Sequence, residues 1–401
     1  MDGVSVAEPA LMLTPLPEFL ADPALRAVLA ALPRARLVGG AVRDAVAGRA
    51  ATDIDLATPD PPEAVARCLA QAGLSAVPTG LAHGTLTAVS AGRGFEITTL
   101  RRDLATDGRH AVIAFTDDWA ADAARRDFTL NTLSMTAEGA VFDYTGGLAD
   151  LRAGVVRFVG DPAQRLAEDW LRALRFFRFQ ARYGRVPPDA ATLAALREAV
   201  PRLAGLSAER VWMEMKRLLA TPDPLAALGL MRMLGVLDAI LPELSGDTSA
   251  LAALVARGAP ADPLLRLAAL LADDAPSPAT RLRFSRAEAA RLAALRTAPM
   301  PPVTADAAAL LPLLADWPAD ILIGRAWLGG RDGAVRDALA RLSRPVFPLR
   351  GQDAQGAGIA PGKALGEALA AVRAWWLAER CVPDRAACLA RLRRFGPAPT
   401  R

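Results

Sequence analysis

Short blocks of apolar and polar residues alternate along the first 160 residues, and this pattern predicts a mixture of strands and short helices. Brief apolar or β-branched runs bounded by Gly, Pro or charged residues indicate strands. Such runs lie at 37–38, around Asp53 and Asp55, and at 74–77, 85–89, 95–100, 112–115, 141–144 and 155–159. Helical spacing predicts short helices at 19–32, 41–46, 61–72 and 117–125, after a loose lead-in over residues 1–20.

From Asp161 onwards the pattern changes to a helical period. Pro162 is expected to open one long helix that continues through Tyr183, because proline is tolerated in a first helical turn. Further helices are predicted at 189–200, 207–220, 224–239, 249–257, 262–272, 285–296, 306–315, 332–343, 362–380 and near 384–394. Breaks that contain proline separate several of them, one near Pro201, and no fixed-period repeat is evident.

The stretch LVGGAVRDAVAGRAATDIDLAT, residues 37–58, reads as strand, Gly-Gly turn, short helix and second strand. Gly39 and Gly40 let the backbone turn sharply and leave room for a ligand close to it. A helix that begins there presents free backbone N–H groups, which suit a phosphate group. A Gly-Gly pair on its own is usually only a turn, so this indication depends on the residues of the second strand.

Asp53 and Asp55 stand at positions i and i+2 of the second predicted strand and should therefore point to the same face. Most such pairs are solvated surface residues. Two adjacent carboxylates repel each other unless a cation lies between them, and Mg²⁺ takes oxygen ligands of this kind, usually together with substrate phosphates. Combined with the Gly-Gly turn, the pair predicts a Mg²⁺ site beside a phosphate site.

The helix predicted after Pro162 carries an acidic doublet followed by arginines at every third position. Glu168, Arg172, Arg175 and Arg178 fall at helical spacing, and Asp169 lies three residues before Arg172. Ordinary surface ion pairs would also produce such a pattern. The bias of charges favours a second interpretation, in which an Asp and an Arg on a rigid helix present acceptors and donors to the edge of a base.

Three further segments carry candidate chemistry. Glu96 stands on a predicted strand rich in β-branched residues. An acid there is either solvated on an outward face or directed into a site, and the alternation of side chains along the strand does not distinguish the two. The segment RRDFTLNTL, 125–133, is dense in polar groups within apolar surroundings. The polar, turn-rich segment 101–110 is predicted to be an exposed loop between strands.

Length, composition and charge indicate a globular protein of several domains. At 401 residues the chain should form two to four domains, and 52% hydrophobic with 22% charged residues indicates a globular protein. A net charge of +4 is compatible with nucleic acid. No apolar run predicts a membrane span or a secretory signal, so no membrane partner is expected. Cys68, Cys381 and Cys388 lack metal-binding spacing, and a reducing cytoplasm is predicted.

Taken together and in this order, LVGGAVRD, DIDLAT, FEITTLR, RRDFTLNTL and EDWLRALRFFRF resemble the motifs of the class II tRNA nucleotidyltransferase / bacterial poly(A) polymerase family. The resemblance covers about residues 36–220. It implies an α+β fold: a polymerase-β-like nucleotidyltransferase head with a small mixed sheet, followed by an all-helical neck, body and tail. The domains are expected at 1–150 (catalytic head), 151–222 (neck with the base-reading helix), 223–300 (body) and 301–401 (tRNA-binding tail).

The implied reaction is nucleotidyl transfer, in which the 3′-hydroxyl of tRNA attacks the α-phosphate of CTP or ATP and pyrophosphate leaves. Two metal ions held by adjacent carboxylates suit this chemistry. By resemblance, Asp53 and Asp55 are the metal carboxylates and Glu96 is a third catalytic acid. The same resemblance assigns nucleotide binding to Gly39, Gly40, Arg43, Arg126, Asp127, Asp169, Arg172, Arg175 and Arg178, with Asp169 and Arg172 reading the base edge.

Within the family, the segment 78–89 resembles the CCA-adding pattern rather than the basic, aromatic stretch of poly(A) polymerases, and the loop 101–110 is intact. Complete CCA addition to tRNA with Mg²⁺ is therefore expected. Alternatives are a poly(A) polymerase, an inactive RNA-binding protein that kept the scaffold, and a dinucleotide-binding enzyme, although GGAVRD does not match the spacing GxGxxG. The oligomeric state stays open between monomer and homodimer.

Overall fold

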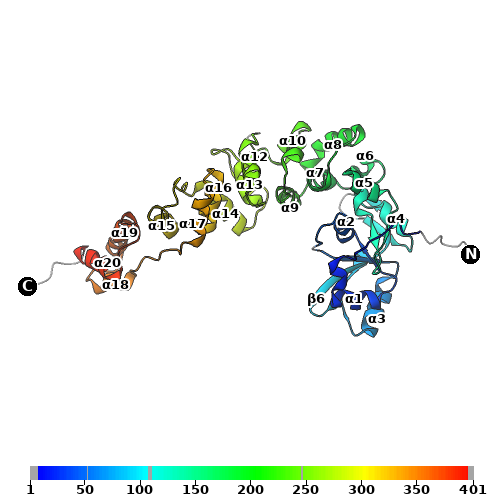
Figure 1. Ribbon diagram of the computed structural model, residues 1–401, viewed down its shortest axis with the longest axis horizontal. Coiled ribbons are helices and arrows are strands. Elements are labelled where there is room, and N and C mark those ends of the chain that lie inside the picture. The colour runs from blue at the N-terminus through cyan, green and yellow to red at the C-terminus, as the bar shows by residue number, and fades with distance from the viewer. Residues whose placement is uncertain (1–7, 52, 107–110, 245–246, 396–401) are drawn as a thin grey trace, which may run out of the picture. The chain divides into compact units, whose positions relative to one another are not determined.

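An eight-stranded mixed sheet organises the N-terminal part of the chain in the computed structural model, which describes residues 8–51, 53–106, 111–244 and 247–395 (Figure 1). The strand order is β1-β10-β9-β2-β3-β6-β5-β4. Within the described strands of this sheet, β3 and β6 are the one pair that runs in parallel. The strands are β1 (Leu11–Met12), β2 (Arg36–Val38), β3 (Asp55–Thr58), β4 (Ser75–Gly80), β5 (Thr85–Ser90), β6 (Arg93–Thr99), β9 (Ser134–Met135) and β10 (Ala140–Phe142).

The two faces of β6 differ because successive side chains of a strand point to opposite sides. Phe95 and Ile97 are each 1% exposed and join the core, so Glu96 lies on the other face. The hairpin that joins β5 to β6 turns at Ala91 and Gly92, both with positive φ, and pairs Ser90 with Arg93. Two-residue turns of this kind fix the register of the strands that they connect.

Helices α1 (Pro23–Ala31) and α3 (Pro62–Gln71) cover the apolar side of the sheet. Asp22 caps the start of α1, accepting a hydrogen bond from the Ala24 N–H at 2.9 Å. The apolar residues of α1 and α3 are spaced at three to four positions and are buried, with Leu25, Val28 and Leu69 fully inaccessible. The opposite side is therefore left for the site, together with α2 (Gly40–Val46), α4 (Trp119–Ala124) and η3 (Thr129–Asn131).

A row of helices follows the sheet within the same unit of the chain. They are α5 (Gly147–Ala153), α6 (Pro162–Glu168), α7 (Leu171–Tyr183), α8 (Ala190–Leu203), α9 (Ala208–Leu219), α10 (Leu225–Met233) and α11 (Val236–Ile240). Buried aromatic rings join α7 to the sheet segment: the Phe128 ring lies 4.9 Å from Phe158, 5.0 Å from Phe179 and 6.2 Å from Phe176. This packing gives α7 a fixed position against residues 127–129.

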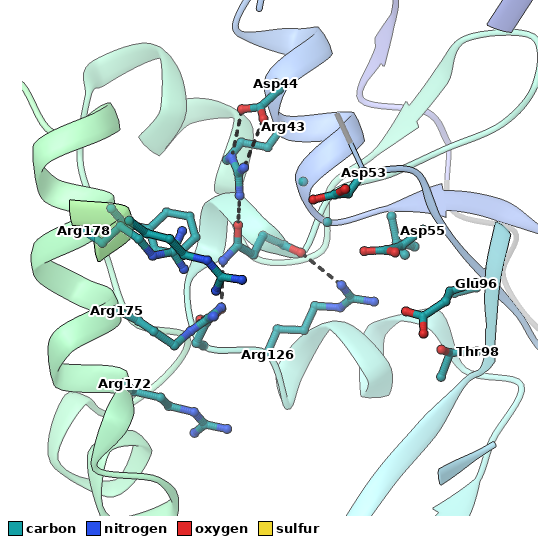
Figure 2. Close-up of a pocket in the computed structure, with 18 of the residues that line it drawn as sticks. Arg43, Asp44, Asp53, Asp55, Glu96, Thr98, Arg126, Arg172, Arg175 and Arg178 are labelled. Carbon is teal, nitrogen blue, oxygen red and sulfur yellow. Dashed lines mark hydrogen bonds and ion pairs between the residues drawn. The ribbon is translucent and has the colours of Figure 1, made fainter. Parts of the chain in front are cut away.

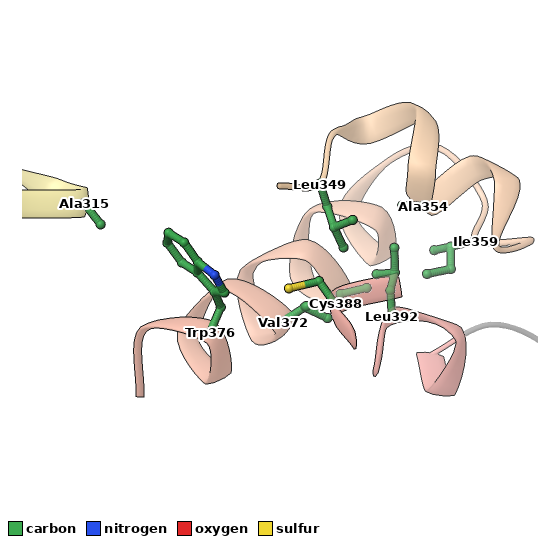
Figure 3. Close-up of a cluster of buried hydrophobic side chains, with 9 residues drawn as sticks. Ala315, Leu349, Ala354, Ile359, Val372, Trp376, Cys388 and Leu392 are labelled. Atoms are coloured by element: carbon green, nitrogen blue, oxygen red, sulfur yellow. The ribbon is translucent and has the colours of Figure 1, made fainter. Parts of the chain in front are cut away.

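The chain divides into two units, Met1–Leu241 and Pro242–Arg401. The second unit is helical in the residues described: α12 (Ser249–Ala256), α13 (Pro263–Leu270), α14 (Arg286–Thr297), α15 (Ala307–Asp316), α16 (Ala319–Leu328), α17 (Gly333–Arg341), α18 (Gly351–Gly356), α19 (Lys363–Ala378), α20 (Arg385–Leu392) and η4 (Arg393–Phe395). One of its apolar clusters includes Val372, Trp376, Cys388 and Leu392 (Figure 3), and another surrounds Leu314 and Leu322.

The predicted α+β class is confirmed, with a mixed sheet followed by helices. The predicted long helix after Pro162 is wrong in one respect, because it breaks at Asp169 into α6 and α7. Asp169 has extended backbone angles (φ −158°, ψ 106°), and its carboxylate accepts a hydrogen bond from the Leu171 N–H at 3.1 Å. A short side chain that bonds the local backbone in this way competes with helix.

Other differences have equally local causes. The predicted strand at 155–159 is only an isolated bridge between Phe158 and Phe128, since its backbone bonds go to irregular partners such as Asp150 and Asp127. Pro201 lies inside α8 instead of ending it. The helix predicted at 224–239 is split at Gly235, whose φ is +78°. The strands β1 and β9 and the helices α5, α16 and α18 were not predicted.

The prediction of an exposed loop at 101–110 is wrong for the first part of this segment. Residues Arg101–Thr106 form β7, which pairs antiparallel with β8 (Ala111–Phe115) outside the main sheet, while 107–110 lie outside the described residues. Backbone hydrogen bonds hold such a ribbon together. It therefore requires no alternation of apolar residues, which is the signal that sequence patterns use to predict strands.

Candidate active site

A cleft of about 900 Å³ lies within the first unit, between the sheet and helices α7 and α9 (Figure 2). All of the predicted site residues line it. They come from the Gly-Gly turn and α2, from the start of β3 and the segment before it, from β6, from the segment after α4, and from α7 and the segment before it. These residues are Gly39, Gly40, Arg43, Asp53, Asp55, Glu96, Arg126, Asp127, Asp169, Arg172, Arg175 and Arg178. The structure thus brings together residues that are up to 139 positions apart in the sequence.

Three carboxylates face the cleft from the sheet side. Parallel pairing places Asp55 opposite Glu96, and Asp53 lies two residues before the start of β3, not on the strand as predicted. Figure 2 shows all three directed toward the same space. Partial burial raises the pKa of Asp55 above its usual value, and the charges of Glu96 and Asp53 raise it further, while Arg126 opposes them. Negative charge at this point is therefore incompletely compensated by the protein.

This carboxylate group fits a divalent cation that shares its coordination with a substrate. Among the described residues, no three His, Cys, Asp or Glu side chains converge closely enough to hold an ion by themselves. Mg²⁺ is commonly bound by one or two carboxylates, with water and substrate phosphates as its other ligands. The uncompensated charge around Asp55 is what a cation would neutralise.

The Gly-Gly turn has the conformation that the sequence predicts. Gly39 has φ +64° and ψ −121°, outside the regions that residues with a Cβ normally adopt, and α2 begins at the next residue. The turn places Gly39 and Gly40 in the wall of the cleft beside Arg126 and Arg43, respectively.

Replacing Gly39 by alanine should lower stability by about 1–3 kcal/mol through backbone strain. A Cβ there would lie 3.5 Å from the Arg126 Nη1, an ordinary contact, so crowding adds little. Thermal melting measures the effect. Gly229→Ala is the matched control: this glycine lies inside α10 with nothing near its Cβ position, and alanine should stabilise the helix there. Equal melting temperatures for both variants would contradict this account.

Arg43 is held in place from several sides. Its Nη1 donates to the Asn131 Oδ1 at 2.5 Å, and its other nitrogens lie 3.3 Å from the Asp44 carboxylate. The guanidinium also lies 4.6 Å from the centre of the Tyr183 ring, and the Tyr183 hydroxyl donates to the Asp44 Oδ1 at 2.5 Å. Asp44 and Tyr183 were not singled out by the sequence, and Asn131 was noted only as part of the polar segment 125–133. All three fix the orientation of Arg43, which was predicted.

Asp122 and Asp127 organise the RRD segment. Asp122 is 3% exposed and accepts from Arg125 at 2.8 Å and from Arg126 at 3.0 Å. Asp127 is buried, and its carboxylate accepts from the Asn131 side chain, the Phe128 N–H and Arg175. Burial alone would raise the pKa of Asp127, but the charge of Arg175 and these hydrogen bonds hold it below its usual value. Asp127 therefore remains ionised and serves as an acceptor for Arg175.

A buried carboxylate from α9 holds the arginines of α7. Glu214 is 3% exposed and accepts from the Arg178 Nε at 2.6 Å, with Arg217 at 3.4 Å and Arg175 at 3.9 Å. The sequence did not identify Glu214 as a site residue. A signal was present, because this charge lies on the apolar stripe of α9 between Val211, Met215 and Leu218.

Asp169 and Arg172, the predicted base-reading pair, both line the cleft but contact different partners. Arg172 pairs with Glu168 and donates to the Arg165 carbonyl, and Asp169 accepts from Arg210 at 2.6 Å. The expectation that both residues stand on one continuous helix is wrong, since Asp169 precedes α7. Neither side chain uses all of its hydrogen-bonding capacity on these partners, so both can still contact a ligand.

Known family models match two segments of the chain. Residues 35–157 match the family model described as the poly A polymerase head domain, and residues 187–247 match the model described as a probable RNA- and SrmB-binding site of polymerase A. These matches support the resemblance of the chain to the class II tRNA nucleotidyltransferase / bacterial poly(A) polymerase family. Nucleotidyltransferases of this family generally use a divalent metal ion.

Similar curated proteins carry CCA-adding names. The chain is 45% identical over 190 residues to CCA tRNA nucleotidyltransferase 1, mitochondrial, of Danio rerio, which covers 46% of this chain and 43% of that protein. It is 37% identical over 219 residues to the CCA-adding enzyme of Geobacillus stearothermophilus, which covers 53% of this chain and 52% of that protein. The matched part is thus about half of the length of these curated relatives.

The likeness to solved structures is more extensive. The CCA-adding enzyme of Bacillus stearothermophilus in complex with CTP has a TM-score of 0.75 and 27% identity, and the match covers 93% of this chain and 98% of that one. The Thermotoga maritima CCA-adding enzyme complexed with tRNA shares the fold, with a TM-score of 0.63 at 20% identity, covering 92% of this chain and 95% of that one.

Among the described residues, no single helix combines the length and the apolar character needed to cross a membrane. Helices α15 and α16 meet those criteria only as a pair, and they are bent by 118° relative to each other.

Proposed function

We propose that the protein adds C, C and A to the 3′ end of tRNA from CTP and ATP without a nucleic-acid template, and releases pyrophosphate. The observation that carries this proposal is the composition of the cleft: three carboxylates on the sheet side, with incompletely compensated negative charge at Asp55, face arginines on the helical side. A nucleoside triphosphate bound with a metal ion requires both. The names of the curated relatives support tRNA as the acceptor.

In this proposal Asp53 and Asp55 hold Mg²⁺, and Glu96 is a third catalytic acid. Bound Mg²⁺ would favour deprotonation of the attacking hydroxyl and neutralise charge that develops on the phosphates. The parallel register of β3 with β6 keeps the Asp55 and Glu96 carboxylates on the same side of the sheet. Their mutual repulsion, expressed in the raised pKa of Asp55, is relieved when a cation binds.

The opposite wall binds the nucleotide. Gly39, Gly40, Arg43 and Arg126 line the cleft together with the carboxylates and would contact the triphosphate, and Asp127 holds Arg175 in position. Arg175 and Arg178 continue this row along α7. Asp169 and Arg172 would read the base edge with the oxygens and N–H groups that their protein partners leave available. The side chains thereby act as the template.

We also propose that residues 1–150 form the catalytic head, 151–222 the neck, 223–300 the body and 301–401 a tRNA-binding tail. The change from sheet to helices after β10 supports the first boundary. The division of the chain after Leu241 falls within the proposed body. The thiols of Cys68, Cys381 and Cys388 are all free, which supports a reducing compartment, and we propose the cytoplasm.

The deciding experiment supplies labelled CTP and ATP with Mg²⁺ to tRNA that lacks its 3′ end. We expect ordered addition of two C and one A, followed by arrest. The name of the matching head model keeps poly(A) polymerase as the second candidate, and a long ladder of A on the same RNA would establish it instead. Binding of tRNA without incorporation would contradict both and leave an inactive RNA-binding scaffold.

RNA binding by arginines of the neck and tail should be mainly electrostatic, because an acceptor stem is an A-form helix recognised by its backbone and shape. The apparent affinity for tRNA should therefore fall steeply as salt rises. A filter-binding series from about 50 to 200 mM salt measures this, and several phosphate contacts would together reduce affinity by orders of magnitude. An affinity that is independent of salt would contradict a phosphate-dominated interface.

A further inference from the structure

A second, smaller pocket of about 210 Å³ lies where the C-terminal ends of three helices meet. Its walls are Val46 and Ala47 at the end of α2, Leu151 and Arg152 in the last turn of α5, Tyr183 at the end of α7, and Arg49 and Arg185 from the segments after α2 and α7. It shares no lining residue with the catalytic cleft.

The charges in this pocket differ from those in the cleft. Three arginines line it and no Asp or Glu does. In the part of the chain that the structure describes, Arg49, Arg152 and Arg185 form no ion pair with a carboxylate. Most arginines of the cleft, in contrast, are paired with acids, as Arg126 is with Asp122 and Arg178 with Glu214.

Capping of helix ends accounts for only part of this positive charge. The Arg49 Nη1 donates to the Arg182 carbonyl at 3.0 Å, and the Arg185 Nη2 donates to the Leu151 and Arg152 carbonyls. Each helix C-terminus carries roughly −0.5 of an elementary charge, so three supply about −1.5 against three positive guanidinium groups. An excess of about +1.5 remains. The Arg152 side chain has no hydrogen bond or ion pair within the described residues, so capping does not explain it.

We propose that this pocket binds a phosphate group. Arginine presents a planar fork of N–H donors that matches phosphate oxygens, and the donors not used on carbonyls are available here. Two of the three guanidinium groups are held in advance, Arg185 by its carbonyl bonds and Arg49 also by stacking 4.9 Å from the centre of the Tyr183 ring. The apolar walls from Val46 and Leu151 strengthen the electrostatic attraction.

Tyr183 lines this pocket and connects it to the cleft through a hydrogen bond to Asp44, which lines the cleft. Its side chain is 6% exposed, its ring faces Arg49, and its hydroxyl bonds Asp44, the partner of Arg43. The phosphate can belong to an RNA backbone or to a free inorganic ion. Both sources present the same tetrahedral oxygens to the pocket, and a measurement at Tyr183 distinguishes them.

The chain contains only two tyrosines, Tyr144 and Tyr183, so uniform 3-fluorotyrosine labelling of the full-length protein gives two ¹⁹F resonances. A Tyr183→Phe variant assigns them. At constant ionic strength, without nucleotide or metal, inorganic phosphate should shift the Tyr183 resonance saturably and leave that of Tyr144 unchanged. A second titration uses a short oligouridylate. The two titrations are compared by their midpoints, expressed as concentration of phosphate groups. A lower midpoint for oligouridylate identifies RNA as the ligand, and a lower midpoint for inorganic phosphate identifies the free ion.

The double variant Arg49→Gln/Arg152→Gln should lower the affinity for whichever ligand shifts the Tyr183 resonance by about tenfold or more, because charge-assisted contacts are lost. Arg67→Gln, at an exposed arginine of α3, is the matched control and should titrate like the unmodified chain. The proposal is overturned if neither ligand moves the Tyr183 resonance, or if the double variant titrates with an unchanged midpoint. Because no nucleotide is present, these outcomes do not depend on the proposed catalytic activity.

Discussion

Asp55→Asn is expected to reduce nucleotide incorporation by at least about a thousandfold while the melting temperature stays unchanged or rises. Activity is lost because asparagine supplies no negative charge to the Mg²⁺ proposed between Asp53 and Asp55. Stability is kept because the Asp55 carboxylate is under electrostatic strain: partial burial, Glu96 and Asp53 all raise its pKa. Removal of that charge removes the repulsion.

The same raised pKa fixes how this group affects stability as pH changes. A carboxyl whose pKa is higher in the folded state binds its proton more tightly there than in the unfolded chain. Its unfavourable contribution is absent below the unfolded value near 3.8, develops as pH rises through the folded value, and is complete above it. The melting advantage of Asp55→Asn should therefore be largest near neutral pH and should vanish in acid.

Incorporation assays and melting curves on the same preparations test this prediction. Asp117→Asn is the matched control, because Asp117 is exposed and precedes α4 outside the cleft lining. It should retain both activity and melting temperature. Retained activity in Asp55→Asn would show that the proposed metal site is misplaced, whereas a large loss of stability would show that Asp55 is structural.

Replacement of Glu214 by alanine should destabilise the first unit by about 3–5 kcal/mol. Glu214 is nearly inaccessible and is the shared counter-ion of Arg175, Arg178 and Arg217, so its loss leaves positive charges facing one another in a poorly hydrated region. For a unit of this size the melting temperature should fall by on the order of 10 °C. Glu214→Gln keeps the shape and an acceptor oxygen, so it should be affected less.

The glutamine variant separates a positioning role from a purely structural one. If Glu214 holds Arg175 and Arg178 for the nucleotide, Glu214→Gln should raise the KM for CTP and ATP more than it lowers kcat. Glu198→Ala on α8 is the control, because Glu198 is exposed and such surface changes usually alter stability by less than about 0.5 kcal/mol. A Glu214→Ala variant that melts like this control would contradict the shared counter-ion.

Elements with a strong local signal were predictable from the sequence. The buried faces of α1 and α3 repeat every three to four residues, and the Gly-Gly turn with its two aspartates indicated the position of the cleft. The strands β1 and β9 are only two residues long and are defined by the strands beside them. No window of their own residues distinguishes them from loops.

Local patterns also did not predict which side chains from distant parts of the sequence form pairs. The spacing of Glu168, Asp169 and Arg172 suggested one continuous helix, whereas the carboxylate of Asp169 bonds the local backbone and Arg210 of α9. Likewise, α7 showed a row of arginines but not that Glu214, on another helix, would neutralise it. Which helices pack together decides these pairs, and that information lies in long-range contacts.

The turn at Ala91 and Gly92 has a consequence for how the gene can vary. It fixes β6 against β5, and β6 in turn sets Glu96 beside Asp55. Side chains alternate between faces, so a slip of one residue would bury Glu96 and expose Phe95. Deletion or insertion of a single codon between the turn and Glu96 should thus be far more damaging than most missense changes there. Deletion or insertion of two codons would keep each side chain of the strand on its original face of the sheet.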